Sequence, residues 1–158
     1  KQRTELNEMI GLGGLKYYLL KVDPHKRMKF NPDESIELNG NTGPFIQYAH
    51  ARIQSLLSKV SESENIALAI HNPEKEIVKL LADYPAVVKE AGNNYSPALI
   101  ANYTYELVKA FNSFYQTYSV MNETDESLKN ARIVISKNVA KVIKSSMRLL
   151  GIDVPNRM

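Results

Sequence analysis

The fold class is decided by the stretch from Ser96 to Tyr118, which reads SPALIANYTYELVKAFNSFYQTY. Its large apolar side chains recur at every third or fourth position, the spacing that gathers them on one face of an α-helix. They are Leu99, Tyr103, Leu107, Ala110, Phe111, Phe114 and Tyr118. Ser96 followed by Pro97 favours a helix start, because serine caps free N–H groups and proline fits the first turn. A long helix is therefore predicted over residues 96–118.

Toward the carboxyl terminus, the same periodicity predicts a final helix from Thr124, its expected cap, to Leu150. Asp125 and Glu126 lie in its first turn, where the helix dipole stabilises negative charge. Gly151 follows directly, and glycine is common just past a helix end. The predicted core face consists of Leu128, Ala131, Ile135, Val139, Val142, Ile143 and Leu150.

Toward the amino terminus, helices are expected over residues 4–20, 42–60 and 72–81, and Pro85 is expected to begin a separate turn. The apolar stripe of the second of these helices leaves Gln47 and Arg52 largely on other faces. That stripe consists of Phe45, Tyr48, Ala49, Ile53, Leu56, Leu57 and Val60.

Residues 1–40 are expected to form a connector and residues 41–158 a helical domain. The glycines at positions 11, 13 and 14 each weaken a helix by up to ~1 kcal/mol relative to alanine, so a neighbour must pack closely against them. That neighbour is expected to lie outside the chain. Prolines and Asx residues predict a linker over residues 22–41, in which residues 27–30 could pair briefly as a strand.

The segments together predict an all-α fold, a helical bundle preceded by a connector helix and an extended linker. Serine and glutamate dominate residues 58–64, which are expected to form an exposed tip. The length of 158 residues and the apolar share of 44% suit a single domain. The longest apolar runs have four or five residues, far fewer than the ~20 that span a bilayer. We therefore expect a soluble protein.

Several kinds of chemistry are not expected in this chain. It has no cysteine, and its three histidines lack the spacing of metal ligands, so no metal site is assigned. It has no GxSxG elbow, Walker A loop or GxGxxG loop, so no catalytic residue is assigned. The chain begins with Lys1 and runs directly into polar, helix-compatible sequence, which suggests an excised part of a longer protein.

The strongest charge pattern is a row of basic residues on the predicted final helix. Between Lys129 and Ile152 there are six basic residues and no acidic one. Four of the six share one face opposite the apolar stripe: Lys137, Lys141, Lys144 and Arg148. We call these four the basic ridge, which suits contact with a phosphate backbone but could equally be a solubilising surface.

The chain is also rich in aromatic residues, with nine tyrosines and four phenylalanines. Exposed rings of this kind can stack on unpaired bases. Helical spacing assigns three of them to the core: Tyr103, Phe111 and Phe114. The better candidates for exposed platforms are Tyr48, Tyr105 and Tyr115.

Three segments of the sequence resemble one family. They are GNTGPFIQYAHARI over residues 40–53, NYTYEL at 102–107 with FNSFY at 111–115, and LLGIDVPNRM at 149–158. Together they are similar to the C-terminal helical domain of arginyl-tRNA synthetases, and the resemblance covers nearly the whole chain. It implies a DALR-type helical domain that holds the anticodon stem and loop of tRNA(Arg).

The resemblance also implies which side chains meet the anticodon loop: Gln47, Tyr48, Arg52, Tyr103, Asn112 and Met158. The tyrosines would stack on splayed bases, while Arg52 and the basic ridge would neutralise phosphates. The family reaction joins arginine to its tRNA with ATP and Mg²⁺, but in a catalytic domain that this chain lacks. The implied partners are therefore tRNA(Arg) and the chain's own catalytic domain, in a monomeric cytoplasmic enzyme.

Other interpretations remain open from the sequence alone. The basic ridge could belong to a helical adaptor that binds an acidic protein, and the salt dependence of tRNA and protein binding would separate these two readings. The chain could also be the equivalent domain of another synthetase, such as the β subunit of the glycyl enzyme. Residual adenylating activity is disfavoured by the missing nucleotide-binding motifs.

Overall fold

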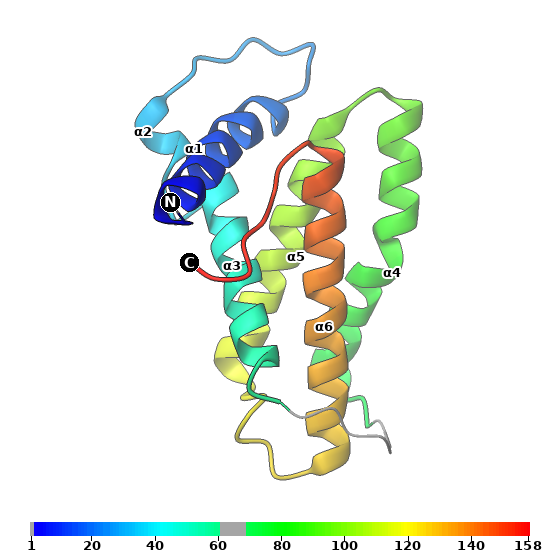
Figure 1. Cartoon of the computed structure of the whole chain (residues 1–158). Helices are drawn as coiled ribbons and strands as arrows, with labels where there is room; N and C mark the ends of the chain where they lie inside the picture. The colour runs from blue at the N-terminus through cyan, green and yellow to red at the C-terminus, as the bar shows by residue number, and fades with distance from the viewer. Residues whose placement is uncertain (1, 61–68) are drawn as a thin grey trace.

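The computed structural model describes residues 2–60 and 69–158, which fold into a bundle of α-helices (Figure 1). The helices are α1 (Gln2–Leu20), α2 (Pro32–Ser35), α3 (Gly43–Leu57), α4 (Asn72–Asn93), α5 (Pro97–Thr117) and α6 (Glu126–Leu149). The described residues contain no strand, which confirms the all-α prediction. The strand expected over residues 27–30 is wrong, because Phe30 instead packs edge-on against Tyr18 of α1, with ring centroids 5.3 Å apart.

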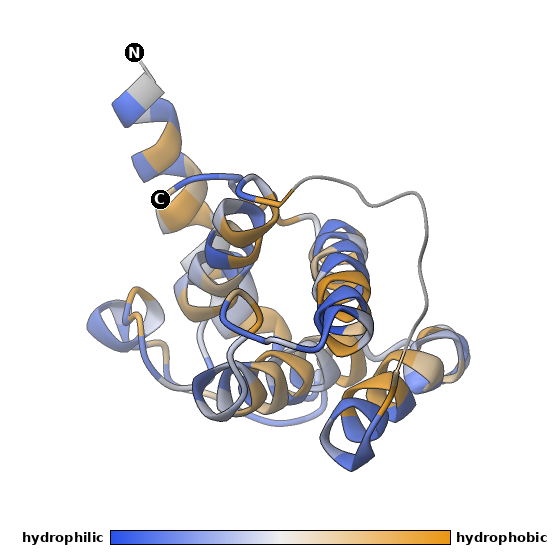
Figure 2. Ribbon diagram, turned by 90° about the horizontal axis from the view of Figure 1, so that it is seen from below, coloured by the Kyte–Doolittle hydropathy of each residue, from blue (hydrophilic) through white to orange (hydrophobic). Residues whose placement is uncertain are grey.

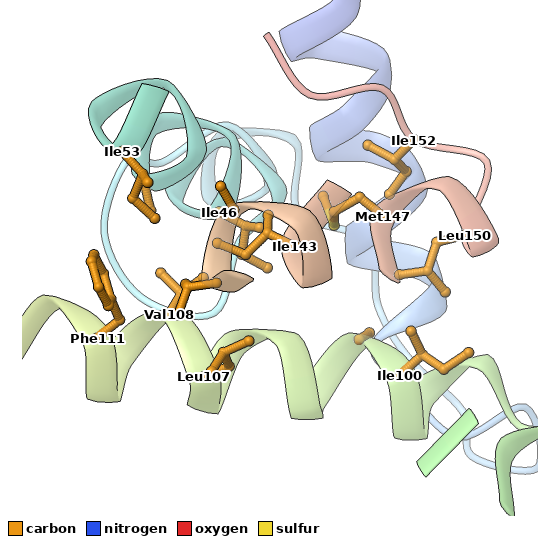
Figure 3. Packing of buried hydrophobic residues seen from close by; sticks show 14 of the residues in the cluster. Ile46, Ile53, Ile100, Leu107, Val108, Phe111, Ile143, Met147, Leu150 and Ile152 are labelled. Carbon is orange, nitrogen blue, oxygen red and sulfur yellow. The ribbon is translucent and has the colours of Figure 1, made fainter. Parts of the chain in front are cut away.

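Helix α5 is the central element, since it packs against α1, α3, α4 and α6. Figure 2 looks along the bundle and shows that each of these helices carries both apolar and polar residues. In Figure 3, Ile46 of α3, Leu107 of α5 and Ile143 of α6 lie in the shared core, and all three are fully buried. Contact on several sides gives α5 a different buried face from the predicted stripe. Of that stripe, Leu107, Phe111 and Phe114 are buried, Leu99, Tyr103 and Ala110 are half-buried, and Tyr118 is exposed. The additional buried residues are Ala98, Ile100, Ala101, Thr104 and Val108.

The helix ends largely follow from local chemistry. The Thr42 side chain caps α3 by accepting a hydrogen bond from the Phe45 N–H at 3.2 Å. Helix α6 is capped by Asp125 and not, as predicted, by Thr124, because the aspartate carboxylate accepts from two N–H groups of the first turn. Gly151 follows the end of α6 with a φ of 67°, the left-handed conformation expected of a glycine at this position.

Helix α4 runs unbroken through Pro85, so the prediction of a short helix and a separate turn is wrong. Proline removes one backbone hydrogen bond and crowds the preceding turn, which usually ends or bends a helix. Here the residue before it is held in place from two neighbouring helices. The Tyr84 ring stacks on Tyr103 of α5 at 5.6 Å, and its hydroxyl donates to Ser145 Oγ of α6 at 2.9 Å. These contacts between helices therefore outweigh the tendency of Pro85 to end α4.

Helix α1 crosses α3 with the two backbones in close contact. A Cβ atom at Gly43 would lie 2.6 Å from the Gly13 carbonyl oxygen, and one at Gly14 would lie 2.6 Å from the Ser35 carbonyl oxygen. The close-packing neighbours of Gly13 and Gly14 are thus α3 and α2. The expectation that the packing partner of these glycines lies outside the chain is wrong, because α2 and α3 of the same chain supply it.

Most of the predicted tip, residues 61–64, lies outside the described residues. In the described part of the chain, no helix combines the length and apolar character needed to cross a bilayer. Helix α1 carries an exposed row of Leu12, Leu15 and Leu19, whose exposed fractions are 48%, 38% and 48%.

Candidate functional site

Aromatic rings and cations gather where α3 and α5 lie side by side. Tyr48 is exposed as predicted, but the prediction that Tyr105 and Tyr115 form exposed platforms is wrong, because both rings are half-buried against the core. Arg52 of α3 lies between two rings, with its guanidinium carbon 5.8 Å from the centre of the Tyr48 ring and 5.4 Å from that of Tyr115. Nearby, the rings of Phe45 and Tyr105 pack with centroids 5.8 Å apart. We define the α3–α5 surface as Phe45, Tyr48, Arg52, Tyr105, Lys109, Asn112 and Tyr115.

The α3–α5 surface offers three kinds of contact to a ligand. The rings present flat faces, and the half-buried Arg52 presents a planar cation held by two of them. Asn112 adds an amide with both donor and acceptor atoms at the wall of a shallow hollow beside Arg52. Lys109 Nζ lies 5.9 Å from the Tyr105 ring and supplies a second cation. This combination suits flat, electron-rich rings joined by negatively charged links.

The basic ridge lies on α6, and all four of its side chains are exposed, as predicted from their spacing. It faces away from the α3–α5 surface. Lys144 is close enough to His50 of α3 to affect that ring electrostatically, so His50 marks the side of α3 that faces α6. Tyr48 and Arg52 are each two residues from His50, and residues two apart on an α-helix point in nearly opposite directions, about 160° apart. The residues predicted to contact RNA therefore lie on two separate faces of the protein, the α3–α5 surface and the basic ridge.

Gln47 is fully buried, which corrects the expectation that it lies on an exposed face of its helix. Its Nε2 atom donates to the Met9 carbonyl of α1 at 3.2 Å and to the Asp153 carbonyl at 2.8 Å. Its Oε1 atom is buried without a hydrogen-bond partner among the described residues. Helix α1 and the segment around Asp153 cover this side chain. The apolar spacing within α3 gives no sign of either neighbour.

Tyr103 is also placed away from the α3–α5 surface, between α4 and α5. Its hydroxyl donates to the Leu80 carbonyl at 2.7 Å, and its ring stacks on Tyr84. Burial, together with the nearby charge of Asp83, raises the pKa of Tyr103 to about 12. This position agrees with the assignment to the core that helical spacing alone favours.

The last residues form an extended tail, residues 151–158, that crosses α3. The Ile152 N–H donates to the Met147 carbonyl at 2.9 Å, and His50 Nδ1 lies 2.8 Å from the Pro155 carbonyl oxygen. Ile152 and Pro155 are buried, whereas Met158 is 42% exposed. Figures 1 and 2 both show the carboxyl terminus beside α3, on the side away from α6. The tail thus carries Met158 toward the side of α3 that holds Tyr48.

His50 is a site residue that the sequence did not single out, because a lone histidine in a helix has no diagnostic spacing. Its ring is fully buried, with Nε2 3.3 Å from Gln54 Nε2. His50 Nε2 accepts a hydrogen bond from Gln54, so the proton lies on Nδ1 and is donated to the Pro155 carbonyl oxygen. In this tautomer the imidazole ring is neutral. Burial, with a smaller contribution from Lys144, lowers the pKa of His50 below its usual 6.5, although the Pro155 carbonyl opposes this shift.

This lowered pKa predicts a loss of stability in mild acid. Between the folded and unfolded pKa values of His50, the unfolded chain binds more protons, so stability rises with pH. The contribution is complete above the unfolded value of 6.5 and is lost as pH falls from there through the folded value. We expect the urea midpoint to fall between about pH 7.5 and about pH 5.5, and to fall less in His50→Asn, which cannot titrate. Equal acid sensitivity in both proteins would contradict this assignment.

Comparison with known proteins places most of the chain in a family. Residues 46–158 match the family model described as the DALR anticodon binding domain. The chain is 52% identical to the arginine-tRNA ligase of Parabacteroides distasonis and 53% identical to that of Bacteroides thetaiotaomicron, each over 165 aligned positions. Each alignment covers 100% of this chain and 28% of the relative. The chain therefore spans just over a quarter of the length of these proteins.

Solved structures show the same fold. The arginyl-tRNA synthetase of Thermus thermophilus superposes with a TM-score of 0.90 at 28% identity, over 95% of this chain and 27% of that one. The synthetase of Plasmodium falciparum shares the fold with a TM-score of 0.88 at 24% identity, over 98% of this chain and 28% of that one. The family model covers most of the chain, and it includes the α3–α5 surface apart from Phe45, the basic ridge and the tail. The chain therefore belongs to the DALR anticodon-binding domain family.

Proposed function

We propose that this chain binds the anticodon arm of tRNA(Arg) and holds the anticodon loop on the α3–α5 surface. The observation that carries this proposal is Arg52, a half-buried cation between the exposed ring of Tyr48 and the half-buried ring of Tyr115. Splayed loop bases stack on tyrosine rings and guanidinium planes, and the phosphates between them need a nearby positive charge. Family membership and the names of the relatives support tRNA as the ligand.

The proposed roles of the sequence-predicted residues follow from where they lie. Tyr48 and Arg52 contact the loop bases, with Asn112 beside them, and Met158 closes the edge of the site from the tail. Gln47 and Tyr103 do not contact the RNA directly in this proposal. Gln47 is covered by α1 and the tail, and Tyr103 bonds to the backbone of α4. The basic ridge attracts phosphates of the RNA from another face, independently of its sequence.

The proposal is tested by binding of a transcribed tRNA(Arg) and of the same tRNA with a swapped anticodon, at two salt concentrations. We expect tighter binding of the cognate anticodon, and a preference that persists when salt weakens both complexes. Equal affinity for both tRNAs would leave only a nonspecific polycation. The alternative of a helical protein adaptor is disfavoured by the family match, and it would show no preference between the two RNAs.

Loss of ridge lysines should reduce salt dependence and not anticodon preference. We expect Lys141→Ala and Lys144→Ala each to lower the slope of log K against log salt by about 1, because each removes one phosphate contact. The affinities for cognate and swapped tRNA should fall by the same factor. Lys89→Ala, which removes an exposed lysine of α4 outside the ridge, is the matched control and should change neither quantity. A ridge variant that alters only the cognate affinity would contradict the assignment.

We further propose that a full-length protein containing this sequence is an arginine-tRNA ligase, as the relatives are named. Arginine, ATP and Mg²⁺ would be handled by a catalytic domain, with this chain supplying tRNA binding. The observation that supports this division is the absence from the sequence of a recognisable nucleotide-binding motif.

A further inference from the structure

The path of the tail is fixed by two polar side chains of α3. Gln47 donates to the Asp153 carbonyl and His50 to the Pro155 carbonyl, each at 2.8 Å. The two side chains lie three residues apart on one face of the helix, and the two carbonyls lie two residues apart along the tail. A helix face is thus paired with an extended segment that has no neighbouring strand. These bonds determine where the tail crosses α3.

Both anchoring side chains are unusual for a helix that faces the core. Gln47 and His50 are fully buried, and a buried polar group is costly unless hydrogen bonds replace its contacts with water. Their hydrogen bonds to carbonyl groups go chiefly to the tail, with Met9 of α1 as the additional acceptor for Gln47. Apolar residues at both positions would fill the same space but would leave the tail carbonyls without donors.

The tail leads from the end of α6 to the other side of α3. After Pro155 the chain continues to a terminus that lies beside α3 on the side away from α6 (Figures 1 and 2). Tyr48 points about 160° away from His50, so it faces the same side as the terminus. The anchors at Gln47 and His50 therefore set how Met158 approaches the α3–α5 surface.

We propose that Gln47 and His50 are positioning residues for anticodon recognition: they hold the tail so that Met158 forms one edge of the site. This inference rests on the proposed function. It assigns part of the anticodon preference to two side chains that contact no RNA. The ordinary alternative is that both residues only stabilise the fold, in which case their effects on recognition are independent of Met158.

The test is a double-mutant cycle on the ratio of the dissociation constants for swapped and cognate tRNA(Arg). The four proteins are the wild type, His50→Leu, a chain shortened by residues 156–158, and the combination of the two changes. We expect each single change to lower the ratio by about tenfold, the effect of losing one ordered contact, and the combination to lower it no further. His50→Asn should keep the wild-type ratio, because its amide N–H can donate to Pro155 as Nδ1 does.

The other binding outcomes each overturn the proposal, and a fallback pair of variants covers a failure to fold. If the two losses multiply, His50 acts through the fold and not through the tail. If the shortened chain keeps the wild-type ratio, Met158 is not part of the site. If His50→Leu does not fold, His50→Asn and His50→Gln carry the same comparison, since only asparagine places its N–H where Nδ1 lies. A wild-type protein without anticodon preference would instead refute the proposed function itself.

Discussion

Replacing Arg132 by methionine should destabilise the fold by about 3–5 kcal/mol, the cost of leaving a buried charge without its partner. Arg132 Nε lies 2.9 Å from Glu74 Oε1, with exposed side-chain fractions of only 7% and 0%. A second guanidinium nitrogen lies 2.7 Å from Glu123 Oε2 and donates to the Ser119 carbonyl. Arg132 thus ties α6 to the start of α4 and to the α5–α6 connection. Urea denaturation measures the loss.

The matched control is another ion pair that differs mainly in burial. Lys79 and Glu76 lie 2.7 Å apart, but their side chains are 69% and 68% exposed, so Lys79→Met should cost less than about 1 kcal/mol. Adding Glu74→Gln to Arg132→Met should recover much of the lost stability, because the unpaired charge is gone. The explanation is wrong if Arg132→Met costs no more than Lys79→Met.

Removing the Tyr48 ring should give the largest loss of cognate RNA binding. Stacking of one base on an aromatic ring contributes about 1–3 kcal/mol, so Tyr48→Ala should weaken cognate tRNA binding by roughly five- to 150-fold. The ring also holds Arg52 from one side, so its loss frees that guanidinium. Tyr48 is 43% exposed, and its removal should leave the urea midpoint nearly unchanged. Direct binding titrations with both tRNAs measure the effect.

Tyr95 provides the matched control for this change. It is an exposed tyrosine between α4 and α5, outside the α3–α5 surface, with 89% of its surface accessible. Tyr95→Ala should leave both affinities at the wild-type level. The assignment fails if the two variants weaken binding equally, or if Tyr48→Ala weakens cognate and swapped tRNA by the same factor.

The fold was predictable where local chemistry decides it. The spacing of apolar residues and the Ser96-Pro97 pair correctly predicted α5 and its first residues, although the Ser96 side chain makes no capping hydrogen bond, and Gly151 marked the end of α6. Prediction failed at Pro85, where the decisive contacts come from residues distant in sequence. Tyr84, next to that proline, is held by Tyr103 and Ser145, and no periodicity within α4 reveals either partner.

The site was predictable only in part, for the same reason. Tyr48, Arg52 and Asn112 share one surface, and the basic ridge is exposed. A helical projection cannot place Gln47, because it shows one helix while the tail and α1 cover the residue from elsewhere. That the ridge and the α3–α5 surface face different ways likewise depends on how α6 packs against α3.

The crossing of α1 over α3 couples the orientations of the two helices. The backbones touch at Gly13 and Gly43, and the buried Tyr17 hydroxyl lies 2.8 Å from the Ala101 carbonyl oxygen of α5. Close-packed interiors transmit displacement instead of absorbing it. Any change in the orientation of α3 would therefore change the orientation of α1 as well. The exposed leucine row, Leu12, Leu15 and Leu19, lies on α1, so the direction in which this apolar face points is set by the packing of α1 on α3.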